Sequence, residues 1–399
     1  MERRKKEVTE SVSKALQPVL DVSKLVAWRH ALHRCPELGF ELGETAGFIE
    51  RQLQELGIET HSAIGQVGLV GVLRKGSSDK AIGLRADMDA LKIQERNTFD
   101  HRSKTDGHMH ACGHDGHSTM LLGAAEALRS ADFDGTVYFI FQPNEEHGLG
   151  AQAMIDDGLF DRFPMDAIYG MHNMPGRPAG QLAMKSGPIM AGEDNFSLTI
   201  VGRGGHASQP HQHIDPLVIS AEIILAMQSI VARSIDPAEQ AVVSVTEIEA
   251  DGTVNVVPST VTIKGDCRSF KRSVSETIER RMRELAEGIC HAHGAKLRFS
   301  YQRVFAATTN HSSKTKHTLA AAQATNPAEL IEYPCDAMTA SDDFAHMLLE
   351  KEGAYVFIGN GSDSVGGCAL HNPHYDFNDE ILVTGVRFWI NLVQQQLPS

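Results

Sequence analysis

Short apolar runs alternate with segments of helical periodicity through the first part of the chain. Four runs rich in Val, Ile, Leu and Phe predict strands at 67–74, 81–87, 135–143 and 166–172. Apolar positions at helical spacing predict helices at 8–33, at 115–131 with Asp115 as N-cap, and in a segment ending near Asp157. This alternation is typical of an α/β fold, a mostly parallel sheet with helices on both faces.

The pattern changes after residue 186. Strands are predicted at 193–202, 241–250, 260–270 and 296–302, with helices from Asp215 to Ser234 and from Ser273 to His293. The first pattern then returns, with helices near 311–325 and 342–350, a strand at 354–360 and a helix from Asn378 to Gln396. We therefore predict a discontinuous catalytic domain, 1–186 and 303–399, and an inserted smaller α+β (ferredoxin-like) domain, 187–302.

The chain is acidic. Its 399 residues include 37 Lys and Arg against 51 Asp and Glu, which gives a formal net charge of -14. Such a balance argues against a nucleic-acid partner or attraction to an anionic membrane through bulk charge. Hydrophobic residues make up 42% and charged residues 22%, as in ordinary soluble globular proteins.

Cysteine usage and apolar segments indicate the compartment. Six cysteines are scattered without a CxxC pair, and no apolar run follows the charged start of the sequence. These features predict reduced thiols and a cytoplasmic location. The longest apolar stretch, Ile219 to Ala232, contains Glu222 and Gln228 and falls short of the roughly 20 residues that a membrane span needs. We expect it to be a buried helix.

Candidate ligands stand at the ends of three predicted strands: Asp87 and Asp89, then Glu145 and Glu146, then His172. Between the first two strands, the segment 109–117 carries Cys112 and His114 just before a predicted helix. Ligands of α/β sheets bind beyond the carboxyl ends of the strands, so these side chains are expected to converge. A thiolate, imidazoles and carboxylates together are the ligand types of a transition-metal site.

Adjacent glutamates suit metal-assisted hydrolysis. One carboxylate can bind a divalent ion, which lowers the pKa of a bound water to about 7. The other, with a pKa raised by burial and by its neighbour, can take the proton of that water as general base. The 20 histidines, five of them within residues 101–117, leave metal buffering without turnover as an alternative. A thiol hydrolase with Cys112 as nucleophile and His114 as base is a third reading.

Nine segments, in this order, resemble the motifs of the M20 metallopeptidase family: RADMDAL (85–91), MHACGHDGH (109–117), QPNEEHGLGA (142–151), MHNMP (171–175), GRGGHASQPH (202–211), NVVP (255–258), DCRSF (266–270), SDDF (341–344) and LHNPHYDFND (370–379). They are most similar to the amidohydrolase branch, which contains N-acyl amino acid, hippurate and auxin-conjugate hydrolases. The similarity covers roughly residues 30 to 395.

The resemblance implies two divalent metal ions per subunit, Zn or Mn in the first place and Co or Ni as further options. It implies five ligands: Cys112, His114, Glu146, His172 and His371. Glu145 would be the general base, and Asp87 would orient a ligand. The inserted domain would supply His206 for the oxyanion, within the subunit or across a homodimer or higher oligomer. It would also supply Asn255 and Arg268 to hold the substrate.

The predicted activity is hydrolysis of the amide bond of an N-acyl or N-aroyl amino acid, which releases a carboxylic acid and a free amino acid. An M20-type dipeptidase or exopeptidase is the nearest alternative. Four residues depart from the usual motifs without removing a proposed ligand or the base: Lys92, Asn144, His147 and Asp342. These departures leave the acyl group and the amino acid of the substrate open.

Overall fold

The computed structural model describes residues 20–363 and 366–399 and divides into two compact units. The first contains the chain up to Gly187, Thr309–Asp336 and His346–Ser399, and the second contains Pro188–Thr308 and Ala337–Ala345. The sequence-based division placed the boundaries at 186 and 302 and assigned everything after 302 to the catalytic domain. In the structure, the segment Ala337–Ala345 groups instead with the smaller unit, which the sequence pattern did not suggest.

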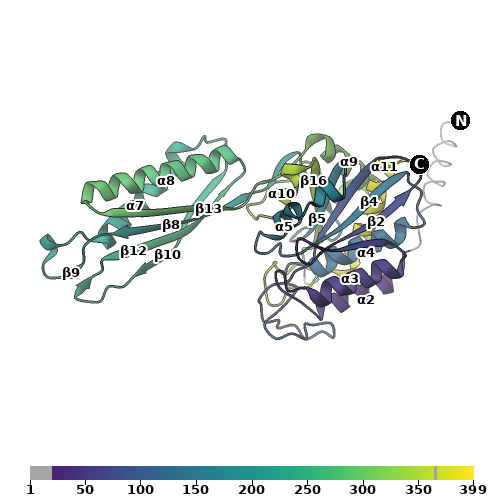
Figure 1. Ribbon diagram of the computed structural model, residues 1–399, viewed down its shortest axis with the longest axis horizontal. Coiled ribbons are helices and arrows are strands. Elements are labelled where there is room, and N and C mark those ends of the chain that lie inside the picture. Colours follow the sequence, from purple (N-terminus) through teal and green to yellow (C-terminus); the bar gives the residue numbers. More distant parts are fainter. Residues whose placement is uncertain (1–19, 364–365) are drawn as a thin grey trace. The chain divides into compact units, whose positions relative to one another are not determined.

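The first unit contains a large mixed sheet (Figure 1). Its eight strands are, in spatial order, β1 (Glu59–Ile64), β2 (Gly68–Lys75), β4 (Gly135–Gln142), β3 (Ala81–Asp87), β5 (Ala167–Pro175), β16 (Gly353–Gly361), β6 (Leu182–Ala183) and β15 (Ile331–Glu332). The four central strands, from β4 to β16, run parallel, whereas β1, β2 and β6 pair antiparallel with their inner neighbours. The predicted α/β class with a mostly parallel sheet is confirmed.

Helices cover this sheet. They are α2 (Val22–His33), α3 (Gly43–Glu55), α4 (His114–Leu128), α5 (Gly150–Asp156), α6 (Leu159–Arg162), α9 (Ser312–Thr325), α10 (Phe344–Glu350) and α11 (Leu382–Gln396). Helix α11 packs against both α4 and α9, and α2 packs against α4. The chain moves one way from β3 to β4 and the opposite way from β4 to β5, so right-handed crossovers place α4 and α5 on opposite faces.

Several local predictions for the first unit need correction. Helix α3 and strand β1 were not predicted, and the part of the 8–33 helix before residue 20 lies outside the described residues. Asp115 is not an N-cap, because Gly113 holds that position with a φ of 99° and Asp115 is buried in the first turn of α4. Only glycine fits there, since a Cβ would lie 2.3 Å from Asn173 Oδ1 and the backbone is left-handed.

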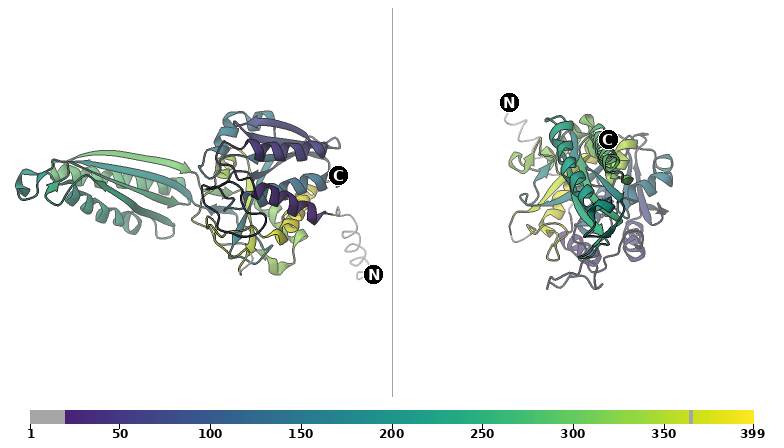
Figure 2. Two further views of the ribbon diagram at one scale, coloured as in Figure 1. Left: turned by 90° about the horizontal axis from the view of Figure 1, so that it is seen from below. Right: turned by 90° about the vertical axis from the view of Figure 1, so that its left-hand side faces the viewer.

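The second unit has the predicted strand–helix–strand–strand–helix–strand order. Its main elements are β8 (Gly192–Val201), α7 (Pro216–Ser234), β10 (Ala241–Ala250), β12 (Thr260–Ser269), α8 (Arg272–His293) and β13 (Lys296–Phe305). The four strands pair antiparallel in the order β10-β12-β8-β13, which is the ferredoxin-like arrangement. Both helices lie on one face of this sheet (Figures 1 and 2). There they cover a core that includes Phe196, Ile223 and Ile278.

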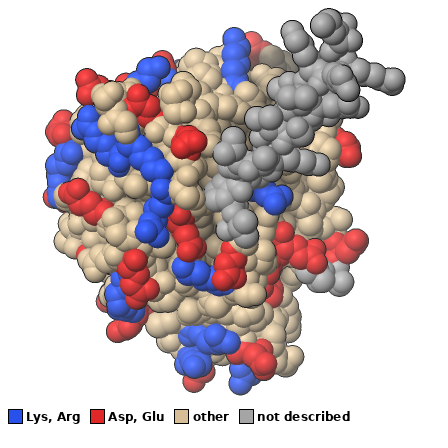
Figure 3. All heavy atoms as spheres, turned by 90° about the vertical axis from the view of Figure 1, so that its right-hand side faces the viewer, with Lys and Arg blue, Asp and Glu red and all other residues tan. Residues whose placement is uncertain are grey.

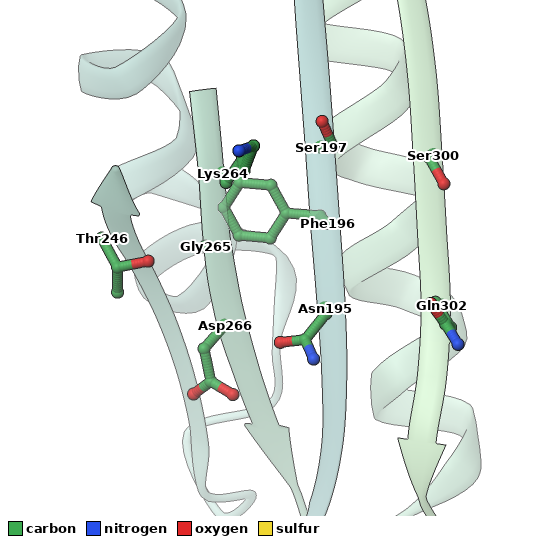
Figure 4. A pocket seen from close by; sticks show the side chains of 9 residues that line it. All are labelled: Asn195, Phe196, Ser197, Thr246, Lys264, Gly265, Asp266, Ser300 and Gln302. Atoms are coloured by element: carbon green, nitrogen blue, oxygen red, sulfur yellow. The ribbon is translucent and has the colours of Figure 1, made fainter. Parts of the chain in front are cut away.

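The opposite face of the four-stranded sheet is polar. Strict alternation along β8 and β12 sends Asn195, Ser197 and Asp266 to this side, where all four strands line a shallow pocket (Figure 4). Asn195 and Asp266 are direct cross-strand partners. This face therefore adds nothing to the apolar core of the unit, which lies wholly between the sheet and its two helices.

Helix α7 differs from the buried helix that the sequence predicted. One side, with Ile219 and Ile223, is buried, but Val218 is 59% and Leu225 is 73% exposed. Among the described helices it is the one long and apolar enough to cross a membrane by length and composition alone, and such a single helix is weak evidence for a span. Its exposed apolar side is a feature that the sequence prediction missed.

Shorter elements complete the described chain. They are β7 (Gly187–Met190), β9 (Gly205–His206), β11 (Val256–Val257), β14 (Thr308–Asn310) and the 3₁₀ turns η1 (Pro210–Gln212), η2 (Ala328–Leu330) and η3 (Asp379–Ile381). On the face drawn in Figure 3, basic and acidic side chains are interspersed. In the part of the chain that the structure describes, that face presents no extended basic surface of the kind that binds nucleic acid.

Candidate metal centre

The carboxyl ends of three parallel strands bring the candidate ligands to one edge of the large sheet. Asp87 ends β3, Glu145 and Glu146 follow β4, and His172 lies within β5. The sequence placed His172 after its strand, but β5 continues to Pro175. Strands β4, β3 and β5 are neighbours in this order, so their ends meet where ligands of α/β sheets bind.

The five residues implied as metal ligands form two overlapping triads. Ligand atoms of Cys112, His114 and His172 lie within 4.8 Å of one another, and so do those of Cys112, Glu146 and His371. Cys112 belongs to both triads. Two triads that share one thiol are an arrangement that could hold a pair of neighbouring cations.

Glu145 lies beside the triads. One of its carboxylate oxygens is within 4.8 Å of ligand atoms of His114 and Glu146. Its backbone N–H and that of Glu146 each donate to the Asp89 carboxylate at 3.1 Å. One buried acid thereby fixes the turn that carries both glutamates.

Asp89 also lies close to His114, whereas the sequence predicted that Asp87 would orient a ligand. Asp89 Oδ1 lies 3.4 Å from His114 Nδ1, on the side of the ring away from the glutamates. Asp87 instead accepts from Arg85 at 2.7 Å and from His117 Nδ1 at 2.6 Å, and it lies 3.9 Å from His114 Nε2. A carboxylate behind a histidine is the usual support of a metal-binding imidazole. In the sequence, the D-x-D spacing of Asp87 and Asp89 at a strand end was the feature that could have pointed to Asp89.

Hydrogen bonding and burial set the protonation state of His172. Its Nδ1–H donates to the Asn173 carbonyl at 2.6 Å, so Nε2 carries the lone pair and faces Cys112 Sγ at 3.3 Å. Burial, followed by the nearby His117, lowers its pKa well below the usual value. A neutral imidazole with a free Nε2 lone pair is the form that binds a metal ion.

Cys112 is held as a thiol without a cation. Burial, then the charges of Glu146 and Glu145, raises its pKa well above the usual value. A nucleophilic cysteine needs the opposite shift, so this environment argues against the thiol hydrolase alternative. The ring nitrogen within hydrogen-bond distance of the Cys112 sulfur is also His172 Nε2 and not a nitrogen of His114, the base that this alternative needs. A divalent ion would reverse this shift, because metal ligation deprotonates a thiol.

Three buried atoms at the site lack hydrogen-bond partners within the described part of the chain. His114 Nδ1 and Nε2 and Glu146 Oε1 are inaccessible to solvent and make no hydrogen bond. Burial raises the pKa of Glu146 to about 7. For His114 burial acts downward, but Asp87 and Asp89 outweigh it and raise the pKa to about 10. Buried polar atoms are normally satisfied, so these residues fit divalent cations placed among them.

Two residues of the site have left-handed backbones. Asn144, directly before the glutamates, has a φ of 51°, and His371 has a φ of 61°. Such a conformation costs on the order of 1–3 kcal/mol for a residue other than glycine and clusters at functional sites. His371 is anchored by its N–H to the Ala111 carbonyl at 2.8 Å, and its Nε2 lies 3.5 Å from Glu146 Oε2. The backbone thus directs the His371 imidazole toward Glu146, another member of the second triad.

Three further predicted residues belong to the second unit. Strand β9 pairs with β11 so that His206 faces Val256, and the Ala207 N–H donates to the Asn255 carbonyl at 3.0 Å. His206 and Asn255, far apart in sequence, are therefore neighbours. Arg268 is held by carboxylates: Glu193 at 2.7 Å and Asp266 at 3.0 Å. It also donates to Ser341 Oγ at 2.9 Å.

The histidine-rich segment 101–117 is not an exposed metal-buffering tract. His110, His114 and His117 are at most 2% exposed, and each sits in its own fixed environment. His101 stacks between Phe99 and His30, with ring centroids 3.8 and 3.9 Å away. Buried, individually packed imidazoles argue against loose and exchangeable metal binding.

His33, on α2, is expected to make the stability of the first unit pH-dependent. Burial lowers its pKa, but Asp115 and Glu95 outweigh burial and raise it from 6.5 to about 9. The added stability is complete below pH 6.5 and is lost as pH rises toward 9, on the order of 1–3 kcal/mol in total. Chemical unfolding between pH 6 and pH 9.5 checks this. As pH rises, the free energy of unfolding of the wild type should fall more than that of His33→Gln, whereas His61→Gln on β1 should follow the wild type. An equal fall in the wild type and in His33→Gln would contradict this role of His33.

Comparison with known proteins agrees with this site. The sequence matches peptidase family M20/M25/M40 over residues 83–395. It is 39% identical to a hippurate hydrolase of Campylobacter jejuni over 92% of this chain and 95% of that protein. It is 34% identical to an N-acetylcysteine deacetylase of Bacillus subtilis over 93% and 96%. The solved structure of the Bacillus subtilis YXEP protein, described as a dinuclear metal binding peptidase, aligns over 94% of this chain and 98% of that one with 32% identity and a TM-score of 0.81.

The fold and the ligand set define the class: the chain is a hydrolase, a metal-dependent amidohydrolase. More particularly, it belongs to peptidase family M20/M25/M40, within the amidohydrolase branch. The resemblance drawn from the nine sequence motifs is thereby confirmed.

Proposed function

We propose that the chain hydrolyses the amide bond of N-acyl or N-aroyl amino acids, releasing a carboxylic acid and a free amino acid. The observation that carries this proposal is the pair of triads that share Cys112, with Glu145 beside them. The names of the relatives, which act on hippurate and on N-acetylcysteine, support the substrate class.

We propose two divalent ions, held by the two triads: Cys112, His114 and His172, and Cys112, Glu146 and His371. When bound, such ions polarise a carbonyl and acidify a water molecule. A thiol and neutral imidazoles suit Zn, and the carboxylate also suits Mn, so these are the ions proposed first, with Co and Ni as further options.

Glu145 is the proposed general base. Its carboxylate takes a proton from the attacking water and delivers it to the nitrogen of the leaving amino acid. Anchoring of its backbone by Asp89 fixes where the carboxylate can lie, which acid–base catalysis requires. Because the first unit alone contains this residue and both triads, the water-activating part of the site is built within one unit.

His206 is the proposed oxyanion donor. The N–H of Ser208 donates to its Nδ1 at 3.2 Å, and the Ser208 hydroxyl lies 2.8 Å from the same atom. Because Nδ1 accepts a hydrogen bond, the proton of the neutral ring is on Nε2. The ring therefore presents an N–H that can stabilise the negative oxygen of a tetrahedral intermediate.

Replacing His206 with alanine is expected to lower kcat by about 10²–10³-fold, as loss of one oxyanion donor does elsewhere, with little change in bound metal. Steady-state kinetics on an N-acyl amino acid measures this. His211→Ala is the matched control, because His211 is an exposed histidine five residues further along the chain. Equal kinetics for His206→Ala and the control would remove His206 from the mechanism.

Asn255 and Arg268 are proposed to hold the substrate, Arg268 through its free carboxylate. Since Glu193 and Asp266 already pair with this guanidinium, a substrate carboxylate would have to replace one of them. Next to the glutamates, His147 is an exposed residue whose Nδ1 bonds Asn144 Oδ1 at 2.7 Å. We propose that this pair, where the family usually has small residues, narrows the range of accepted substrates.

We also propose that the protein forms a homodimer or higher oligomer. The exposed apolar side of α7, with Val218 and Leu225, is a surface that a second copy would cover. All six cysteines are free thiols, which supports a reducing, cytoplasmic location.

A substrate panel tests the proposed function. The metal-free protein is reconstituted separately with Zn, Mn, Co and Ni and assayed on N-acetyl amino acids, N-benzoyl amino acids and dipeptides with a free amino terminus. The proposal requires turnover of an acylated amino acid to exceed that of every dipeptide. Preference for dipeptides would favour the dipeptidase alternative, and metal binding without any turnover would favour buffering.

A further inference from the structure

A group of charged side chains, three of them buried and three partly exposed, lies behind the candidate metal centre and belongs to neither triad. It consists of Arg29, His33, Glu95, Asp115, Asp376 and Asp379. Arg29 is 1%, His33 0% and Asp115 1% exposed. Arg29 and His33 stand one helical turn apart on α2, so both point to the same side of that helix. A charged cluster at such depth needs a reason, because burying ion pairs adds little to stability.

The Arg29 guanidinium connects two ligand-bearing segments. Its Nη1 lies 3.6 Å from Asp115 Oδ2, and Asp115 directly follows the ligand His114. The same Nη1 donates to Asp376 Oδ1 at 2.9 Å, and Nε donates to Asp379 Oδ1 at 2.7 Å. These two acids follow His371 on the C-terminal segment. A guanidinium presents its donors in a fixed planar fork, whereas a lysine ammonium offers rotatable donors on a flexible stem and would hold these acids less rigidly.

His33 holds the same segment from the other side. Its Nδ1 lies 2.7 Å from Asp115 Oδ2, and its Nε2 lies 3.3 Å from Glu95 Oε1. The other Glu95 oxygen accepts from the Ser103 N–H at 2.6 Å, within the long loop that leads to Cys112. Asp115 is thus fixed by two residues of α2, and through it the first turn of α4 is fixed.

We propose that Arg29 and His33 are positioning residues. They hold the turn with Cys112 and His114 in register with the segment that carries His371, so that both triads form at once. These segments also meet directly, through a hydrogen bond from the His371 N–H to the Ala111 carbonyl at 2.8 Å and through Tyr375 and Phe377, which lie against Gly113 and Gly116. This inference rests on the proposed metal centre. It predicts that both residues tune metal affinity, although neither touches a ligand atom.

Cobalt binding tests the proposal independently of turnover. The full-length metal-free protein is titrated with Co²⁺, following the charge-transfer absorption between the Cys112 thiolate and cobalt. Arg29→Lys and His33→Gln are expected to weaken cobalt binding by about 10–100-fold, the usual effect of removing support behind a ligand, and to alter the band at saturation. At saturating metal, KM should stay near the wild-type value.

The matched control is His30→Gln. His30 also lies on α2, but its hydrogen bond, of 2.9 Å, goes to Asp379 of the C-terminal segment and not to Asp115. It should bind cobalt within about twofold of the wild type if Asp115 is the decisive partner. Wild-type affinity and spectrum in both test variants, with only a lower melting temperature, would reduce the cluster to a purely structural role. If Arg29→Lys does not fold, His33→Gln decides alone.

Cobalt binding by the wild type separates the proposed metal centre from the proposed positioning role. A wild-type protein that takes up no cobalt would overturn the proposed metal centre together with this inference. A wild type that binds cobalt tightly, beside variants that bind it equally well, would overturn the positioning role alone and leave the proposed function intact.

Discussion

Glutamine in place of Glu145 is expected to lower kcat for hydrolysis of an N-acyl amino acid by about 10²–10⁴-fold, the range for loss of a general base. The amide side chain has nearly the same size but cannot accept the proton of the attacking water. Its backbone N–H would still donate to Asp89, so the turn should keep its shape. Steady-state kinetics measures the fall in kcat, and metal analysis measures whether the site is preserved.

The metal content separates a lost base from a damaged site. Glu145→Gln should retain the wild-type metal content, whereas Glu146→Gln, which removes a member of the second triad, should lose part of it. Glu41→Gln makes the same change at an exposed position and serves as the control. Near wild-type kcat in the Glu145 variant would show that another group takes the proton.

Removal of metal is expected to have the largest effect. Chelation should abolish hydrolysis, since bound ions lower the activation barrier by several kcal/mol, which is roughly 10³-fold or more in rate. Activity should return when a divalent ion is added back. Cys112→Ser should reproduce most of the loss without any chelator, because both triads contain this residue.

Cys35→Ser is the matched control for that variant, since Cys35 is a free thiol outside the triads. It should keep wild-type activity and metal content. A thiol hydrolase would give the opposite pattern: it would remain active after chelation and lose activity only with Cys112. Full activity in thoroughly metal-free protein would therefore exclude the proposed mechanism.

Much of this architecture could be predicted from local pattern. Buried strands such as β3 and β4 show as apolar runs, and placing acids at their ends follows from the geometry of parallel sheets. Helix α7 shows the limit of such reasoning. Its composition indicated a buried helix, yet whether a given apolar side is covered depends on which partner packs there.

Other features of the site depend on contacts between distant residues. Asp89 supports both glutamates across 56 and 57 positions, and Arg29 reaches Asp376 across 347. The hydrophobic periodicity of the sequence cannot predict such pairs, because tertiary packing brings these residues together. His371 was reached only through family resemblance, and its left-handed backbone has no signature in the residue itself. The N–H that fixes the His206 tautomer likewise comes from a turn that the pattern did not reveal.

Sharing Cys112 between the triads has a consequence for oxidative damage. Peroxide that converts a sulfur to a sulfinic or sulfonic acid removes a soft ligand irreversibly. In a centre with separate ligands, such a lesion would leave one ion in place and some residual catalyst. In the proposed centre a single modified sulfur would disable both metal positions together, so partly oxidised samples should be mixtures of active and inactive molecules.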